Sequence, residues 1–127
     1  MNRAAIISND IANGEELLAA LDRAKVKARV ALWAVLPEYE DWRLVISDPK
    51  FDTPDLRDGY RLIRDSLSSA GSTTERTPTI LILPTRDRFI RELRRIYGKS
   101  TSVAGMRLGG RMIGDRFIED AYVYRIS

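Results

Sequence analysis

Basic side chains gather in one short segment of the C-terminal half. They are Arg86, Arg88, Arg91, Arg94, Arg95 and Lys99. On a helix, positions 88, 91 and 95 share one face and position 94 lies beside it, so their guanidinium groups form a row about 10 Å long. Guanidinium groups fit the oxygens of phosphates and carboxylates with paired hydrogen bonds. Arg88, Arg91, Arg94 and Arg95 are therefore a candidate nucleic-acid-binding surface.

A second interpretation of this segment needs no ligand. Asp87 and Glu92 lie among the arginines and can pair with them on a solvent-exposed helix face. The net charge of the whole chain is only +3, which is small for strong electrostatic binding to DNA. Aromatic residues that could stack on bases are not interleaved with the arginines of this face. We favour the second interpretation from the sequence.

The charge is nevertheless unevenly distributed along the chain. Residues 1–75 hold 10 basic and 13 acidic side chains, a net charge of −3. Residues 76–127 hold 11 basic and 5 acidic side chains, a net charge of +6. A binding surface for an anionic partner is therefore expected, if it exists, in the C-terminal part.

The sequence contains neither cysteine nor histidine. This absence excludes disulfides, thiolate nucleophiles, Ser-His-Asp triads and metal sites built on cysteine or histidine. Catalysis would have to use carboxylates, lysine, tyrosine, or a hard metal ion held by oxygen ligands. We predict no catalytic residue, no metal ligand and no cofactor, and an enzyme is not the favoured class.

One acidic pattern is similar to a metal-dependent nuclease motif, with Glu38 upstream and Asp48-Pro49-Lys50 downstream. The predicted strand over residues 42–47 lies between them, so at about 3.3 Å per residue the two carboxylates are roughly 30 Å apart. A single metal ion needs both within a few ångström. The pattern therefore predicts the end of a strand.

Acidic residues also interrupt the apolar C-terminal segment. Glu119 and Asp120 point to opposite faces of a strand and cannot converge on one ligand. We expect one of them to pair with Arg107 or Arg111 across a hairpin. The Gly109-Gly110 pair lacks the strand–turn–helix order of a phosphate-binding loop and predicts a bulge or a bend.

Helix and strand patterns alternate in the first half of the chain. Apolar residues at helical spacing predict a helix over residues 2–23, with a start at Ile11 as the alternative. Residues 26–36 and 42–47 alternate in the manner of strands and predict an antiparallel hairpin.

A second helix is predicted after a clear start signal, Thr53-Pro54-Asp55, in which Thr53 is the expected cap and Pro54 the first helical residue. Gly71 is the expected terminator. The buried stripe of this helix is expected to contain Leu56, Tyr60, Ile63 and Leu67. Residues 79–83 are apolar on both faces and predict a fully buried strand.

The third helix is predicted over residues 85–97, capped by Thr85. Its inward residues are expected to be Phe89, Leu93 and Ile96. Strands over 106–113 and 116–126 then flank a two-residue turn at Gly114-Asp115. The order α-β-β-α-β-α-β-β predicts one domain over residues 1–127 of the α+β (mixed α/β) class, with helices packed on a mostly antiparallel or mixed sheet.

Three segments carry a resemblance to a known group: residues 31–33 (Ala-Leu-Trp), Trp42 to Ile46 with Pro49 beyond, and Phe117 to Ile126. With them, the chain resembles a group of small bacterial proteins of unknown function over most of its length after the first helix. The resemblance implies a recurrent bacterial domain. It implies no activity and no functional residue.

Two hypotheses on function follow. Apolar residues make up 44% and charged residues 31% of the chain, which is typical of a small soluble domain. With no export signal and no membrane span in the sequence, we expect a cytoplasmic location. The favoured hypothesis is a non-catalytic protein-interaction or self-associating module that forms a homodimer, because its hairpins leave free edges. The alternative is a nucleic-acid-binding accessory protein that uses the arginine-rich third helix.

Overall fold

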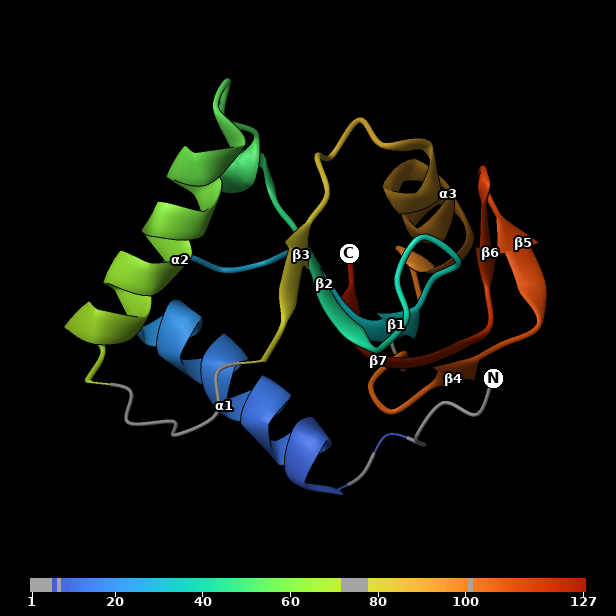
Figure 1. The fold of residues 1–127 in the computed structure, drawn as a ribbon, viewed down its shortest axis with the longest axis horizontal. Helices are drawn as coiled ribbons and strands as arrows, with labels where there is room; N and C mark the ends of the chain where they lie inside the picture. Colours follow the sequence, from blue (N-terminus) through green and yellow to red (C-terminus); the bar gives the residue numbers. More distant parts are fainter. Residues whose placement is uncertain (1–5, 7, 72–77, 101) are drawn as a thin grey trace.

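The computed structural model describes residues 6, 8–71, 78–100 and 102–127. Within them the chain forms three α-helices, one short 3-10 helix and seven strands (Figure 1). In chain order these are α1 (Ser8–Arg23), β1 (Val30–Val35), β2 (Arg43–Ser47), η1 (Pro49–Phe51), α2 (Leu56–Ser69), β3 (Ile80–Ile82), α3 (Arg88–Tyr97), β4 (Arg107–Leu108), β5 (Arg111–Ile113), β6 (Arg116–Ile118) and β7 (Asp120–Ile126). The α+β class is confirmed, and the order agrees approximately with the predicted one.

Five strands form one mixed sheet in the order β3-β2-β1-β7-β4, and β5 and β6 form a separate two-stranded sheet. The central strand β1 is antiparallel to β2 and to β7, whereas β2 is parallel to β3. The predicted β1–β2 hairpin is therefore confirmed. All six residues of β1 are buried, because a central strand with both faces covered must be apolar on both.

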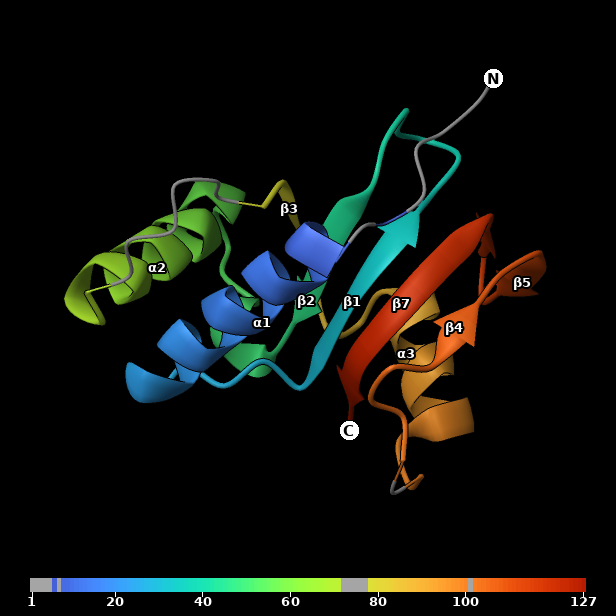
Figure 2. The same ribbon diagram turned by 90° about the horizontal axis from the view of Figure 1, so that it is seen from below.

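Helices and the small hairpin cover the two faces of this sheet. α1 and α2 lie on one side, and α3 with the β5–β6 hairpin lies on the other (Figures 1 and 2). Charge divides in the same way. α1 carries four acidic residues and one arginine, whereas α3 carries four arginines and one glutamate. The uneven charge along the chain thus becomes a difference between two sides of the molecule.

The helix starts differ from the predicted ones. α1 begins at Ser8, between the two predicted starts, and residues 2–5 and 7 lie outside the described residues. Asp55, and not Thr53, caps α2, since its side chain accepts a hydrogen bond from the N–H of Arg57 (2.9 Å). Leu56 is 54% exposed instead of buried, because it lies in the first turn, beyond the part of α2 that packs on the sheet.

The cap of α3 is also different from the prediction. Asp87 accepts a hydrogen bond from the N–H of Phe89 (2.9 Å) and begins the helix at Arg88. Thr85 instead hydrogen-bonds through its N–H and its hydroxyl to Asp52. Aspartate and threonine are both good caps, so the sequence alone could not choose between them.

The buried face of α3 differs from the predicted one at one residue. Phe89 and Leu93 are fully buried as predicted, but Ile96 is 46% exposed and Ile90 is buried in its place. At 3.6 residues per turn Ile96 lies about 20° from Phe89 around the helix axis, whereas Ile90 lies about 100° from it on the other side. Helical spacing therefore favours Ile96, but the structure packs the Ile90 side against the sheet.

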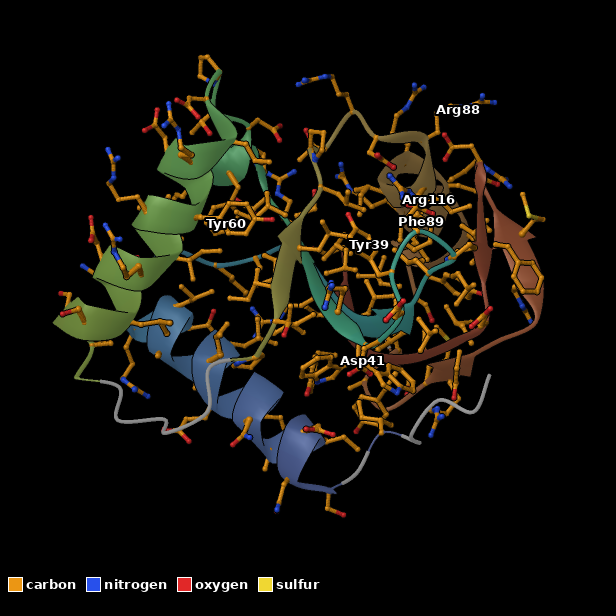
Figure 3. The ribbon with its side chains drawn as sticks, in the orientation of Figure 1. Tyr39, Asp41, Tyr60, Arg88, Phe89 and Arg116 are labelled. Carbon is orange, nitrogen blue, oxygen red and sulfur yellow. The ribbon has the colours of Figure 1, made fainter. Side chains whose placement is uncertain are left out.

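β3 is an edge strand, and the prediction of a fully buried strand is wrong. It pairs only with β2, and Ile80 and Leu81 are half-buried. The N–H of Ile82 donates to the hydroxyl of Tyr60 on α2 (3.0 Å), and Figure 3 shows Tyr60 between α2 and β3. Tyr60 thus occupies a donor that an approaching strand would need.

The two C-terminal strands that were predicted are four, of which β4, β5 and β6 are short and β7 has seven residues. Gly109-Gly110 forms the predicted bend between β4 and β5, with Gly110 at a φ of +65°. After this bend β5 and β6 leave the main sheet and pack with α3, and β7 returns to pair with β1 and β4. The turn at Gly114-Asp115 is confirmed. Among the described residues no helix has the length and apolar character needed to cross a bilayer.

Candidate anion-binding surface on helix α3

The core positions α3 so that its arginines face outward. Phe89, Ile90 and Leu93 are 0% exposed, which directs the opposite side of the helix to solvent. Figure 3 shows Arg88 on the outer side of α3 and Phe89 on the inner side. The outward side contains Arg88, Arg91 and Arg95, in agreement with their spacing.

These three arginines line a single surface hollow. Its volume is about 520 Å³, and its other lining residues are Glu92 and Gly114. One wall is thus the outer face of α3, and the other is the turn of the β5–β6 hairpin. The three guanidinium groups therefore reach the hollow from the helix wall, and Gly114 contributes backbone from the hairpin wall.

Gly114 allows the hairpin turn to approach the helix. Its φ is +61°, a conformation that favours glycine. A Cβ at this position would lie 2.7 Å from the carbonyl oxygen of Arg88 and 3.0 Å from the Cα of Phe89. The turn therefore lies against the backbone of the first turn of α3, and no side chain fits between them.

The arginines of α3 differ in their partners. Arg95 donates from Nε to Glu92 (3.1 Å), and this hydrogen bond holds the pKa of the exposed Glu92 below its usual value. Arg94 is turned to the other side of the helix, where its Nε donates to the carbonyl oxygen of Ser127 (2.7 Å). Within the described residues Arg88 and Arg91 have neither an acidic partner nor a hydrogen bond from their side chains.

Three of the four predicted residues thus come together, and Arg94 does not. The predicted local pairing is also only half correct. Glu92 pairs with Arg95, but Asp87 caps the helix and accepts from Nη2 of Arg116 (3.3 Å). Asp87 is therefore not available to neutralise the arginine surface, and two guanidinium groups stay exposed.

Arg116 is a residue that the sequence reasoning missed. It lies on the inner face of the hairpin beside Ile113, its cross-strand partner, and its side chain is only 19% exposed. It donates through Nη1 to Glu38 and through Nη2 to Asp87, and Figure 3 shows it between α3 and the strands. Its buried Nε has no hydrogen-bond partner among the described residues. Arg116 thus links the hairpin to α3 through Asp87 and to the β1–β2 loop through Glu38. Its position opposite Ile113 across the predicted turn was the signal in the sequence that could have identified it as an inward-facing residue.

The remaining acidic candidate residues form ion pairs or hydrogen bonds with other residues of the chain. Asp120 accepts two hydrogen bonds from Arg107 (2.8 and 2.9 Å), so the predicted ion pair is confirmed. Asp48 is buried and accepts from the N–H of Lys50 (3.1 Å), whereas Glu38 pairs with Arg116. No group of three or more carboxylates placed to hold a metal ion occurs among the described residues.

The hollow can hold an anion. Two guanidinium groups without a partner among the described residues, and a third that shares its charge with Glu92, present planar donors suited to phosphate or carboxylate oxygens. Among the described residues that line the hollow, the carboxylate is that of Glu92, which pairs with Arg95. The guanidinium groups are suited to binding an anion.

Comparison with protein-family models, with curated proteins and with solved structures finds no match to this chain. The resemblance to small bacterial proteins therefore stays a prediction.

Proposed function

We propose that this protein is a non-catalytic module that binds the phosphate backbone of nucleic acid through Arg88, Arg91 and Arg95. A single observation carries the proposal: these arginines line one hollow, and two of them have no partner within the described part of the chain. Unpaired guanidinium groups are free to replace the counterions of a polyanion. A cytoplasmic location, where nucleic acid is accessible, belongs to the same proposal.

Helix α2 provides an internal comparison. It also carries three exposed arginines, but each lies beside a carboxylate: Arg57 at 3.0 Å, Arg61 at 3.5 Å and Arg64 at 3.8 Å. The positive charge of α2 is thus locally balanced, whereas that of α3 is not. The small net charge of the chain argues against binding anywhere on its surface, but it does not weaken a local field on α3, since the acidic α1 lies on the other side of the sheet.

The test replaces the three arginines together with glutamine. R88Q/R91Q/R95Q keeps helix propensity and most of the side-chain length while removing three charges. Affinity for mixed-sequence DNA or RNA, measured by fluorescence anisotropy over a series of salt concentrations, should fall. The slope of log affinity against log salt should shrink by about 2–3 units.

R57Q/R61Q/R64Q on α2 is the matched control, because it removes the same charge from the other side of the molecule. It should change the slope by less than about one unit. Equal effects of the two triple variants would mean that binding reflects net charge and not the hollow. A parent protein without salt-sensitive binding at about 50 mM salt would refute the proposal.

Protein interaction, including self-association into a homodimer, is the second candidate. The observation that favours it is an apolar pair on the outer face of the β5–β6 hairpin: Met112 is 62% and Phe117 is 40% exposed. Exposed aromatic and methionine side chains are enriched in protein interfaces.

A further inference from the structure

The outer face of the β5–β6 hairpin carries two large apolar side chains. Met112 and Phe117 are cross-strand partners, so their side chains share one face of the hairpin. On the inner face Ile113 and Ile118 are buried at 2% and 0% exposure. The burial of the inner pair fixes the direction of the outer pair, which points to solvent.

The hairpin that carries this apolar face also contributes to the arginine hollow. The hairpin turn contains Gly114, which lines the hollow. Met112 and Phe117 lie two and three residues from Gly114, within about 10 Å along the strands. Figure 3 places Arg88 near the same end of the hairpin. An aromatic ring that is distant from the arginine segment in sequence thus lies on the hairpin whose turn lines the hollow.

The hairpin also limits which nucleic acid can reach α3. The major groove of a DNA duplex is about 12 Å wide and admits one helix of about 10–12 Å diameter. The hairpin turn lies in backbone contact with the first turn of α3, so helix and hairpin together are too wide for the groove. A single strand is flexible and can place its phosphates in the hollow while its bases turn outward.

We infer that the partner is single-stranded nucleic acid, held by its phosphates in the hollow and by a base stacked on Phe117. This inference rests on the function proposed above and adds the strandedness of the partner and a residue that contacts the base. Stacking on an aromatic ring is tolerant of sequence, so no strong sequence preference is expected.

The experiment compares three ligands of about 20 nucleotides, longer than the site of a small single-strand-binding domain. They are a thymine single strand, a single strand of the same length with abasic sites, and a mixed-sequence duplex. We expect the parent protein to bind the thymine strand at least about fivefold more tightly than the abasic strand, the lower end of the range for stacking of one base. The duplex should bind more weakly than the thymine strand.

F117A should remove the preference for the thymine strand over the abasic strand and leave the salt slope unchanged. F117W should keep the preference, because tryptophan also stacks on bases. L56A is the matched control, since Leu56 is also an exposed apolar residue (54%, against 40% for Phe117) and lies on the far side of the molecule, and it should have no effect. Circular dichroism of each variant shows whether it is folded.

Several outcomes overturn the inference and leave the proposed function standing. One is duplex binding as tight as single-strand binding. Another is salt-sensitive binding in which F117A and the parent bind the thymine strand equally. If F117A also converts a dimer into a monomer, the apolar face holds a second copy of the chain. Absence of salt-sensitive binding to all three ligands refutes the proposed function itself.

Discussion

The contact between Gly114 and α3 allows a sharp test of how the hollow is built. Replacing Gly114 with alanine places a methyl group 2.7 Å from the carbonyl oxygen of Arg88. That oxygen belongs to the backbone of a helix and cannot rotate away. An alanine at positive φ costs roughly 1–2 kcal/mol, and overpacking against a rigid neighbour costs a further 1–3 kcal/mol or so. We expect G114A to lower the free energy of unfolding by about 2–5 kcal/mol, the sum of these two costs.

The variant G110A separates the cost of the positive φ from the cost of the close contact. Gly110 has nearly the same φ, +65° against +61° for Gly114, but a Cβ there meets no atom within 4 Å. G110A should therefore carry only the conformational cost. The difference between the two variants, about 1–3 kcal/mol, measures the close approach of the hairpin to the helix.

Urea unfolding followed by circular dichroism gives the measurement. The midpoint should fall further for G114A than for G110A, with an unchanged m-value because the surface exposed on unfolding is the same. Equal midpoints for the two variants would refute the reasoning, since they would mean that the turn does not touch α3.

Two further predictions concern the rest of the fold and the oligomeric state. Gly14 of α1 lies over Tyr124, whose hydroxyl accepts from Nε1 of Trp33 (2.9 Å) and donates to the carbonyl oxygen of Ile11 (2.7 Å). A Cβ at Gly14 would lie 2.2 Å from that hydroxyl. G14A should therefore lower the free energy of unfolding, measured in urea, by about 1–3 kcal/mol, although alanine by itself favours a helix by about 1 kcal/mol over glycine. A neutral or stabilising effect would contradict the packing of α1 on Tyr124. Light scattering at micromolar concentration should give twice the chain mass of 14.4 kDa if the chain forms the homodimer expected from the sequence, and a mass near 14.4 kDa at every concentration would rule that dimer out.

Local patterns in the sequence determined the features that depend on a few neighbouring residues. The run from Val30 to Val35 is apolar on both faces, and only a central strand with two covered faces accommodates such a run. Arg88, Arg91 and Arg95 share a face because helical geometry brings residues three and four apart together. The turn at Gly114-Asp115 followed from residue types suited to a tight hairpin.

Only the tertiary structure decided which arginines of α3 are left without a partner in the part of the chain that the structure describes. Asp87 is withdrawn from the arginine surface by Arg116, 29 residues away, and Arg94 by the carbonyl oxygen of Ser127, 33 residues away. The β5–β6 hairpin, which leaves the main sheet, likewise brings Gly114 against the backbone of Arg88, 26 residues away in sequence. A periodic pattern reports which residues share a face, but the partner that each side chain takes depends on contacts between segments distant in sequence. No spacing within α3 contains that information.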